Sequence, residues 1–371
     1  MTTLEPSRLQ QGSKTTMSTE TEPAAADPNP DELAGSRRSA FSRISPARAS
    51  IVYIYAAGFL LFALWVPDLW FSWDTHKSVL NISFAVPAIV AVGLVVPLLA
   101  GAFDLSIAGV MSASAITSSW LVVDKGWGVY TALAAALVVA LIAGVLNGLL
   151  VVKVGINSFI ATLGVGAVLS AYAEWRSGGL QITGFPDEFK DLARRELIFG
   201  LQAKVLYLVV LAFIVWYVIE HTPIGRYLQA TGDNQDAARL AGVQTNKYTF
   251  LALVTSVLIA GFAGVVQTAG VGAGNSNTGA PFLLSAFAAA FLGSTQFKGR
   301  FNVWGTVAAV WVLLSLVKGV ELALQSYRWL NQLFFGTALI VAVGMSKLLE
   351  RRTVRLAGRR RRQEAAEGLG G

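Results

Sequence analysis

The sequence predicts an all-α integral membrane protein with about ten transmembrane helices. Hydrophobic residues make up 54% of the 371 residues, charged residues only 14%, and the mean hydropathy is +0.57. Soluble domains carry roughly 25% charged residues. Long intervals without a charged residue recur along the chain, and a membrane-spanning helix needs about 20 apolar residues. One polar segment, 222–247, interrupts these intervals and predicts a short cytoplasmic helix between spans six and seven.

The N-terminal segment, residues 1–48, is rich in Ser, Thr, Pro, Ala and Glu and contains little that could build a hydrophobic core. We therefore expect a disordered cytoplasmic tail. It does not resemble a signal peptide, because the hydrophobic segment after it is too long and begins too late. Met17 is an alternative start, and the sequence does not decide between it and Met1.

We expect a transmembrane domain over residues 49–350, divided by charge-free intervals. The interval 248–297 accommodates two spans, because its middle, 270–281, is a turn-rich loop. Pro97 and Gly101 should break the second span. The intervals are 49–67, 78–103, 105–123, 126–152, 154–173, 205–219, 248–297, 301–317 and 329–346.

The distribution of Lys and Arg predicts the orientation. With a cytoplasmic N-terminus, the cytoplasmic segments carry 18 basic residues and the external segments carry 9, as the positive-inside rule requires. Both termini are then cytoplasmic, and residues 174–204 form a long external loop. The basic tail, 351–371, lies beside a span, so we expect it to anchor on anionic lipid headgroups rather than to bind nucleic acid.

Composition excludes several kinds of chemistry. The chain has no cysteine and only two histidines, His76 and His221, without metal-ligand spacing. Thiol chemistry is therefore excluded, and a metal site is not expected. No Gly-Lys dipeptide occurs, so the chain lacks the phosphate-binding loop of a P-loop ATPase. We expect no cofactor in this chain, and any ATP that drives it must be hydrolysed by another subunit.

The polar segment has the local signals of a short helix. Asp233 or Asn234 can cap a helix over Gln235–Ala241, and Gly242 supplies a left-handed stop. A helix of roughly two turns is not stable alone in water. We therefore expect the flanking spans, and a docked partner, to hold it.

Several polar residues in the spans have two interpretations each. Asp104 can cap the third span or contact a substrate, and Ser106 can satisfy neighbouring backbone donors. Asn81 can face a water-filled path or pair with a neighbour. Thr162 can bond its own preceding helical turn. The spacing Gly144-x-x-x-Gly148, with Asn147 between, favours close helix packing.

The external loop holds an amphipathic stretch within 178–200, with Phe185, Phe189 and Leu192 among charges of both signs. This pattern predicts a short helix on the outer surface. Such an element can meet a soluble partner or cover the mouth of the helix bundle, and the sequence does not decide between these roles.

The segment Asp236–Gly242 resembles the acidic-Ala-Ala-x-x-x-Gly signature of ATP-binding cassette importer permeases. Further segments are similar to the ribose-type branch of that family, and the resemblance covers roughly residues 50–349. In this chain Asp236 stands where glutamate is commoner, and Ser285 stands where many relatives have an acidic residue. The matching segments are Thr222–Tyr227, Thr231–Asn234, Asp104–Ser106, the region of Asn81, Asn157–Gly164 and Gly299–Thr306.

The resemblance implies a transport subunit, the transmembrane permease domain of a bacterial inner-membrane importer, that performs no covalent chemistry. It implies two permease copies, two ATPase subunits that hold ATP and Mg, and an external solute-binding protein. The short helix would fit a groove on the ATPase through Asp236, Ala237, Ala238, Arg239, Leu240 and Gly242. Candidate residues along the path, which would lie near the interface of the two copies, are Asn81, Asp104, Ser106, Thr162 and Ser285.

The implied substrate is a monosaccharide such as ribose or xylose. Branched-chain amino acids, nucleosides or a small cyclic signal are alternatives within the same family. A different class, the ion-driven secondary transporter, usually needs ionisable residues inside its spans. Here the spans contain almost none beyond Asp104, which argues against that class.

Overall fold

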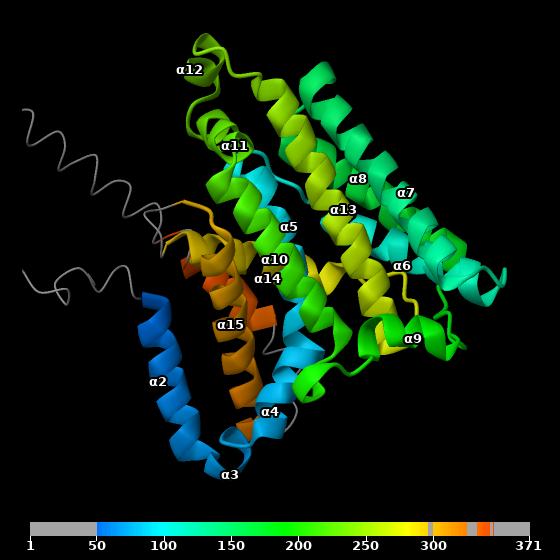
Figure 1. The fold of residues 1–371 in the computed structure, drawn as a ribbon, viewed down its shortest axis with the longest axis vertical. Helices are drawn as coiled ribbons and strands as arrows, with labels where there is room; N and C mark the ends of the chain where they lie inside the picture. The colour runs from blue at the N-terminus through cyan, green and yellow to red at the C-terminus, as the bar shows by residue number, and fades with distance from the viewer. Residues whose placement is uncertain (1–49, 296–299, 325–331, 342–343, 345–371) are drawn as a thin grey trace, which may run out of the picture. The chain divides into compact units, whose positions relative to one another are not determined.

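The computed structural model describes residues 50–295, 300–324, 332–341 and 344. The predicted tails, 1–48 and 351–371, and the end of the last interval lie outside the described residues. Within the described residues all regular elements are helical, with isolated bridges at Ile182–Gly274 and Glu196–Gln202 (Figure 1). The prediction of an all-helical, multi-span membrane protein is therefore confirmed.

Six of the described helical segments are long and apolar enough to cross a membrane, and four apolar helices are shorter. Each predicted interval overlaps one of these ten, and 248–297 overlaps two, which are separated by the predicted loop. The long segments are Trp73–Leu99, Val129–Val154, Ser158–Ser177, Ala203–His221, Thr245–Val271 and Val303–Leu324. The shorter ones are Tyr55–Trp65, Ile107–Val123, Ala280–Ser294 and Gln332–Val341.

The first half of the bundle runs from α2 to α8. The long helix Trp73–Leu99, which is the second predicted span, is continuous but irregular, because a π-helical stretch, η3, joins its α4 and α5 parts. This helix begins at Trp73, before the predicted interval 78–103. The earlier start includes Asp74 in the first turn of α4, where a carboxylate stabilises the helix. The bounds are α2 Ser50–Trp65, α3 Pro67–Trp70, α4 Trp73–Ser78, η3 Val79–Phe84, α5 Ala85–Leu99, α6 Ile107–Val123, α7 Val129–Leu149, η4 Leu150–Val154 and α8 Ser158–Ser177.

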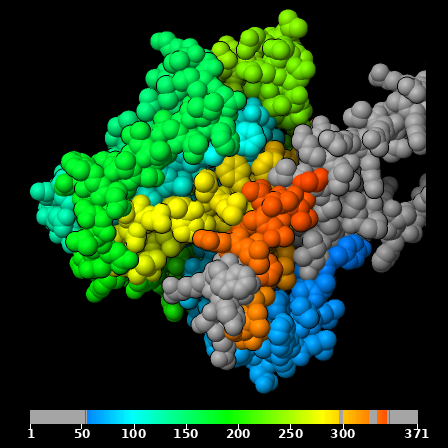
Figure 2. Space-filling view, turned by 180° about the vertical axis from the view of Figure 1, so that it is seen from behind, coloured from blue at the N-terminus to red at the C-terminus, as the bar shows by residue number. Residues whose placement is uncertain are grey.

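The second half begins with the short helix α9 and contains the polar segment. Its bounds are α9 Asp187–Arg194, η5 Ile198–Gly200, α10 Ala203–His221, α11 Pro223–Asp233, α12 Gln235–Leu240, α13 Thr245–Val271, α14 Ala280–Ser294 and α15 Val303–Leu324. The helix over 332–341 lies on the outside, beside the yellow α13–α14 region in Figure 2. A Cβ at its Gly336 would lie 4.0 Å from Leu284 of α14.

Helix α6 lies inside the bundle, in contact with α7, α8, α13 and α14. Nearly all its residues are buried, including Ser112, Ser114 and Ser118. Small side chains let the surrounding helices approach closely, and hydroxyls satisfy backbone groups. For example, Ser112 Oγ accepts from the N–H of Gly279 at 3.0 Å.

The predicted small-residue face on α7 packs against α13. A Cβ at Gly144 would lie 3.0 Å from the Cα of Val254, and one at Gly148 would collide with the ring of Phe250. Asn147 links α7 to the residues before α6, since its Nδ2 donates to Ser106 Oγ at 2.7 Å. The packing role predicted for this face is thus confirmed.

Helices α6 and α8 cross with their backbones in close contact at Gly109 and Gly166. A Cβ at Gly109 of α6 would collide with the backbone of Gly166 of α8. Gly109→Val should therefore force α6 and α8 apart and destabilise the protein by about 1–3 kcal/mol. Gly164→Val is the matched control, because a Cβ there meets nothing within 4 Å. Thermal unfolding of both purified variants in detergent measures the difference, and equal midpoints would contradict it.

Candidate functional site

The candidate site is the polar segment at one end of α13, where α11 and α12 project from the bundle (Figure 1). Thr222 ends α10 with an extended backbone, and Pro223 occupies the first turn of α11, where proline is favoured. The sequence reasoning did not identify α11 as a helix. Thr222-Pro223 was the available signal for its start.

Helix α12 has the predicted caps. Of the two candidate N-caps the structure uses Asn234, whose Oδ1 accepts from the N–H of Ala237 at 2.9 Å. The helix ends at Leu240, one residue before the predicted Ala241. Gly242 has φ of +83°, and the N–H of Val243 donates to Ala238 O at 3.0 Å. These bonds close the turn that stops the helix.

The surface of α12 is almost entirely exposed. Ala238 is buried, whereas Asp236, Ala237, Arg239 and Gly242 are exposed. Leu240 is 91% exposed, which is unusual for a leucine outside the lipid-facing helices. Leu240 lies between Arg239 and the left-handed turn at Gly242, and it is an exposed apolar side chain that another protein could cover.

Helix α11 attaches this element to a break in the membrane bundle. The break comprises Ala100–Ser106, between α5 and α6. A Cβ at Gly232, near the end of α11, would collide with the carbonyl of Leu99 and lie 3.0 Å from Gly101 N. Gly101 itself has φ of +76°. The two backbones therefore touch without side chains between them.

Side chains from α7 and α8 hold the other end of the break. Asp104 is completely buried, and its Oδ1 accepts from Ser106 N at 3.1 Å and from Ser106 Oγ at 2.6 Å. Thr162 Oγ1 accepts from Leu105 N at 3.0 Å. It also donates to Ser158 O, in its own preceding turn, at 2.7 Å.

The structure thus brings three of the five candidate path residues together, namely Asp104, Ser106 and Thr162. The other two lie apart from them. Asn81 is buried and makes two hydrogen bonds to the loop before α10. Its Nδ2 donates to Gly200 O at 3.0 Å, and its Oδ1 accepts from Gln202 N at 2.9 Å. Ser285 donates to Phe282 O of its own helix at 3.0 Å. A path role for the five residues stays a prediction.

The opposite end of α13 carries α9, the helix of the loop that the sequence predicts to be external. α9 packs on α13 with Phe189 buried and stacked on Phe185, at 4.5 Å between ring centroids. Arg194 donates to Gly270 O at 2.9 Å and to Val271 O at 2.8 Å. The predicted amphipathic element is confirmed as a helix, and its apolar face covers the end of α13.

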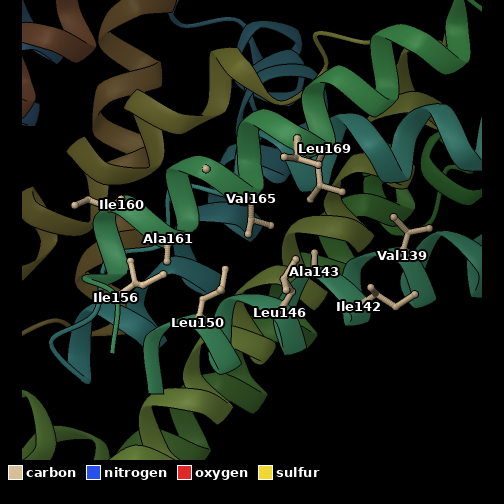
Figure 3. A pocket seen from close by; sticks show the side chains of 12 residues that line it. Val139, Ile142, Ala143, Leu146, Leu150, Ile156, Ile160, Ala161, Val165 and Leu169 are labelled. Atoms are coloured by element: carbon tan, nitrogen blue, oxygen red, sulfur yellow. The ribbon is translucent and has the colours of Figure 1, made fainter. Parts of the chain in front are cut away.

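Two cavities in the bundle are apolar. One of about 510 Å³ lies between α7 and α8, with Val139, Ile142, Val165 and Leu169 pointing into it (Figure 3). Another of about 240 Å³ lies between α10, α11 and α13. Aliphatic walls offer a polar solute no hydrogen bonds, so the cavity between α7 and α8 suits lipid chains or a partner helix.

Comparison with known proteins finds a family whose model matches residues 79–343, described as the permease component of the branched-chain amino acid transport system. The ribose import permease protein of Escherichia coli K12 is 30% identical over 246 residues, covering 64% of this chain and 75% of its own length. The D-allose transport system permease protein of the same strain is 25% identical over 268 residues, covering 72% and 82%. An autoinducer 2 import system permease protein of Escherichia coli O9:H4 is 29% identical, covering 69% and 74%.

Asp104 allows its two interpretations to be separated. If it acts as a structural acceptor, Asp104→Leu leaves the Ser106 donors unsatisfied and costs about 1–3 kcal/mol, whereas the isosteric Asp104→Asn keeps one acceptor oxygen. The expected result is a lower midpoint of thermal unfolding for the leucine variant only. A leucine variant of normal stability that no longer transports would instead favour substrate contact.

Proposed function

The chain belongs to the permease family of the branched-chain amino acid transport system, and from this premise we propose that it is the membrane-spanning subunit of an ATP-driven importer. The observation that carries the proposal is α12, a capped, exposed helix joined to the bundle through α11. As a permease component, the chain supplies the pathway, and separate subunits would bind and hydrolyse ATP with Mg.

The proposed topology has ten spans, with α12 between the sixth and the seventh. All ten apolar helices of the described residues then cross the membrane, the four shorter ones included. A cytoplasmic orientation of the α12 side is supported by the 18 basic residues that the predicted cytoplasmic segments carry, against 9 in the predicted external segments. The same orientation puts α9 on the external face of a bacterial inner membrane and both termini in the cytoplasm.

The proposed assembly contains two permease copies, two ATPase subunits and an external solute-binding protein. Each ATPase would receive α12 in a groove, with Leu240 and Ala237 against its apolar floor and Asp236 and Arg239 at the rim. On closing, the ATPases would move both α12 helices. Alternating access follows if this motion reaches the spans, because rigid helices transmit a displacement at one end to the other.

The proposed substrate is a small polar solute, most simply a monosaccharide such as ribose. The relatives named for ribose and D-allose support this choice. A relative named for autoinducer 2 and the branched-chain description of the family keep other small solutes as alternatives.

The coupling role of α12 can be tested at its left-handed turn. Gly242→Val places a β-branched residue at φ of +83°, a value that such residues almost never adopt. The turn should therefore rearrange, and α12 should no longer fit the groove on the ATPase. We expect normal membrane insertion but loss of substrate-stimulated ATP hydrolysis in the reconstituted complex. Arg239→Glu should have the same effect by reversing a charge at the rim.

The matched control for this experiment is Gly155→Val. Gly155 has φ of +84°, and a Cβ there, as at Gly242, would meet nothing within 4 Å. Gly155 lies between η4 and α8, so the control variant suffers the same backbone strain outside α12. Equal stimulation in the Gly242 and Gly155 variants would contradict the coupling role.

The substrate class is tested on the external partner. We expect the solute-binding protein that stimulates ATP hydrolysis by this permease to bind a monosaccharide in a calorimetric titration. Binding of leucine, a nucleoside or autoinducer 2 with no sugar response would replace the monosaccharide assignment and leave the importer assignment intact.

A further inference from the structure

A third cavity lies at the α12 end of the bundle, between the end of α10, α11 and the start of α15. Its volume is about 510 Å³. Unlike the two apolar cavities, the described part of its wall carries formal charges of both signs, from Arg300 and Glu220. None of the candidate coupling or path residues lines it. The cavity therefore needs an explanation of its own.

Arg300 lacks a counter-ion among the described residues. The amide of Gln229, with its oxygen toward the guanidinium, lies 2.6 Å from Nε, 2.9 Å from Nη2 and 3.0 Å from Nη1. This partner is neutral, so it orients the guanidinium without cancelling its charge. The ion pairs among the described residues, Lys77–Glu196, Lys190–Asp187 and Lys318–Glu321, include neither Arg300 nor Glu220.

Aromatic rings form the apolar part of the wall. Trp216 of α10 lies 6.1 Å from Trp304 of α15 and 4.6 Å from the imidazole of His221, measured between ring centroids. Tryptophan is enriched where a bilayer meets water. Helix α15 begins at Val303, so the positive end of its dipole lies at the same wall as Arg300. The cavity combines an interfacial position, an anion-binding group and a separate carboxylate.

We propose that this cavity binds the headgroup of a phospholipid that carries a free amine, of the phosphatidylethanolamine type. The phosphate would accept hydrogen bonds from the Arg300 guanidinium, whose planar donors suit phosphate oxygens. The ammonium would pair with Glu220, and the glycerol backbone would lie along Trp216 and Trp304. Basic pockets between helices on the cytoplasmic side are known to receive lipid headgroups.

Charge distinguishes this ligand from the alternatives. A neutral sugar would contact the aromatic rings but leave both Arg300 and Glu220 without a counter-charge. Inorganic phosphate would satisfy Arg300 alone and would be repelled by Glu220. A headgroup with one phosphate and one ammonium neutralises both groups at once. The proposal does not depend on the importer assignment, since it requires only that this end of the bundle lies at a membrane surface.

The test is native mass spectrometry of the full-length permease, purified with and without its ATPase subunits, together with thermal unfolding in defined lipids. The wild type should retain phosphatidylethanolamine in preference to phosphatidylcholine, whose trimethylated amine cannot donate hydrogen bonds. Arg300→Gln should lower phospholipid retention about tenfold or more. Glu220→Gln should still retain phospholipid but lose the preference for the free amine.

Two further variants control for folding and for general charge. Arg226→Gln removes an exposed arginine of α11 outside the cavity, and it should retain lipid like the wild type. Arg300→Lys keeps the charge and should keep part of the binding. Retention by Arg300→Gln equal to the wild type would overturn the proposal. Stabilisation by inorganic phosphate or a monosaccharide but not by lipid would also overturn it.

Discussion

The contact between Gly232 and the Leu99–Gly101 backbone is the constraint on which the rest of the polar segment depends. Two short segments, more than 130 positions apart in the sequence, approach so closely that a single Cβ at Gly232 would collide. The two backbone segments can shift little relative to each other, because no flexible side chain lies between them. Any displacement of α11 must therefore move the end of α5 or break the contact.

The break between α5 and α6 connects the contact at Gly232 to helices α7 and α8. On one side it meets Gly232, and on the other its backbone and side chains are bonded to Asn147 of α7 and Thr162 of α8. Buried hydrogen bonds of this kind are costly to leave unmade, so the break is expected to move with its neighbours. In the proposed mechanism, motion of α12 would reach α6, a buried helix, through α11 and this break.

The sequence predicted those features of the site that depend on neighbouring residues. Asn234, Gly242 and the short helix between them follow from capping rules that act within a few positions. The packing face on α7 follows from the spacing of Gly144 and Gly148. The Gly232 contact could not be predicted, because nothing local to either segment specifies its partner. Asn81 shows the same limit, since the groups it bonds lie more than 115 positions away.

The hydrogen bonds that the candidate path residues already make limit how a solute could use them. A polar solute entering the bundle must replace its bonds to water with bonds to protein. Asp104 Oδ1, Thr162 and Asn81 already bond to backbone groups within their own chain, and the cavity beside α7 and α8 is aliphatic. A solute could therefore use these groups only if the break opened. A path between two copies of the chain that uses Asp104 and Ser106 therefore stays a prediction, and it requires the break to open because both side chains are completely buried.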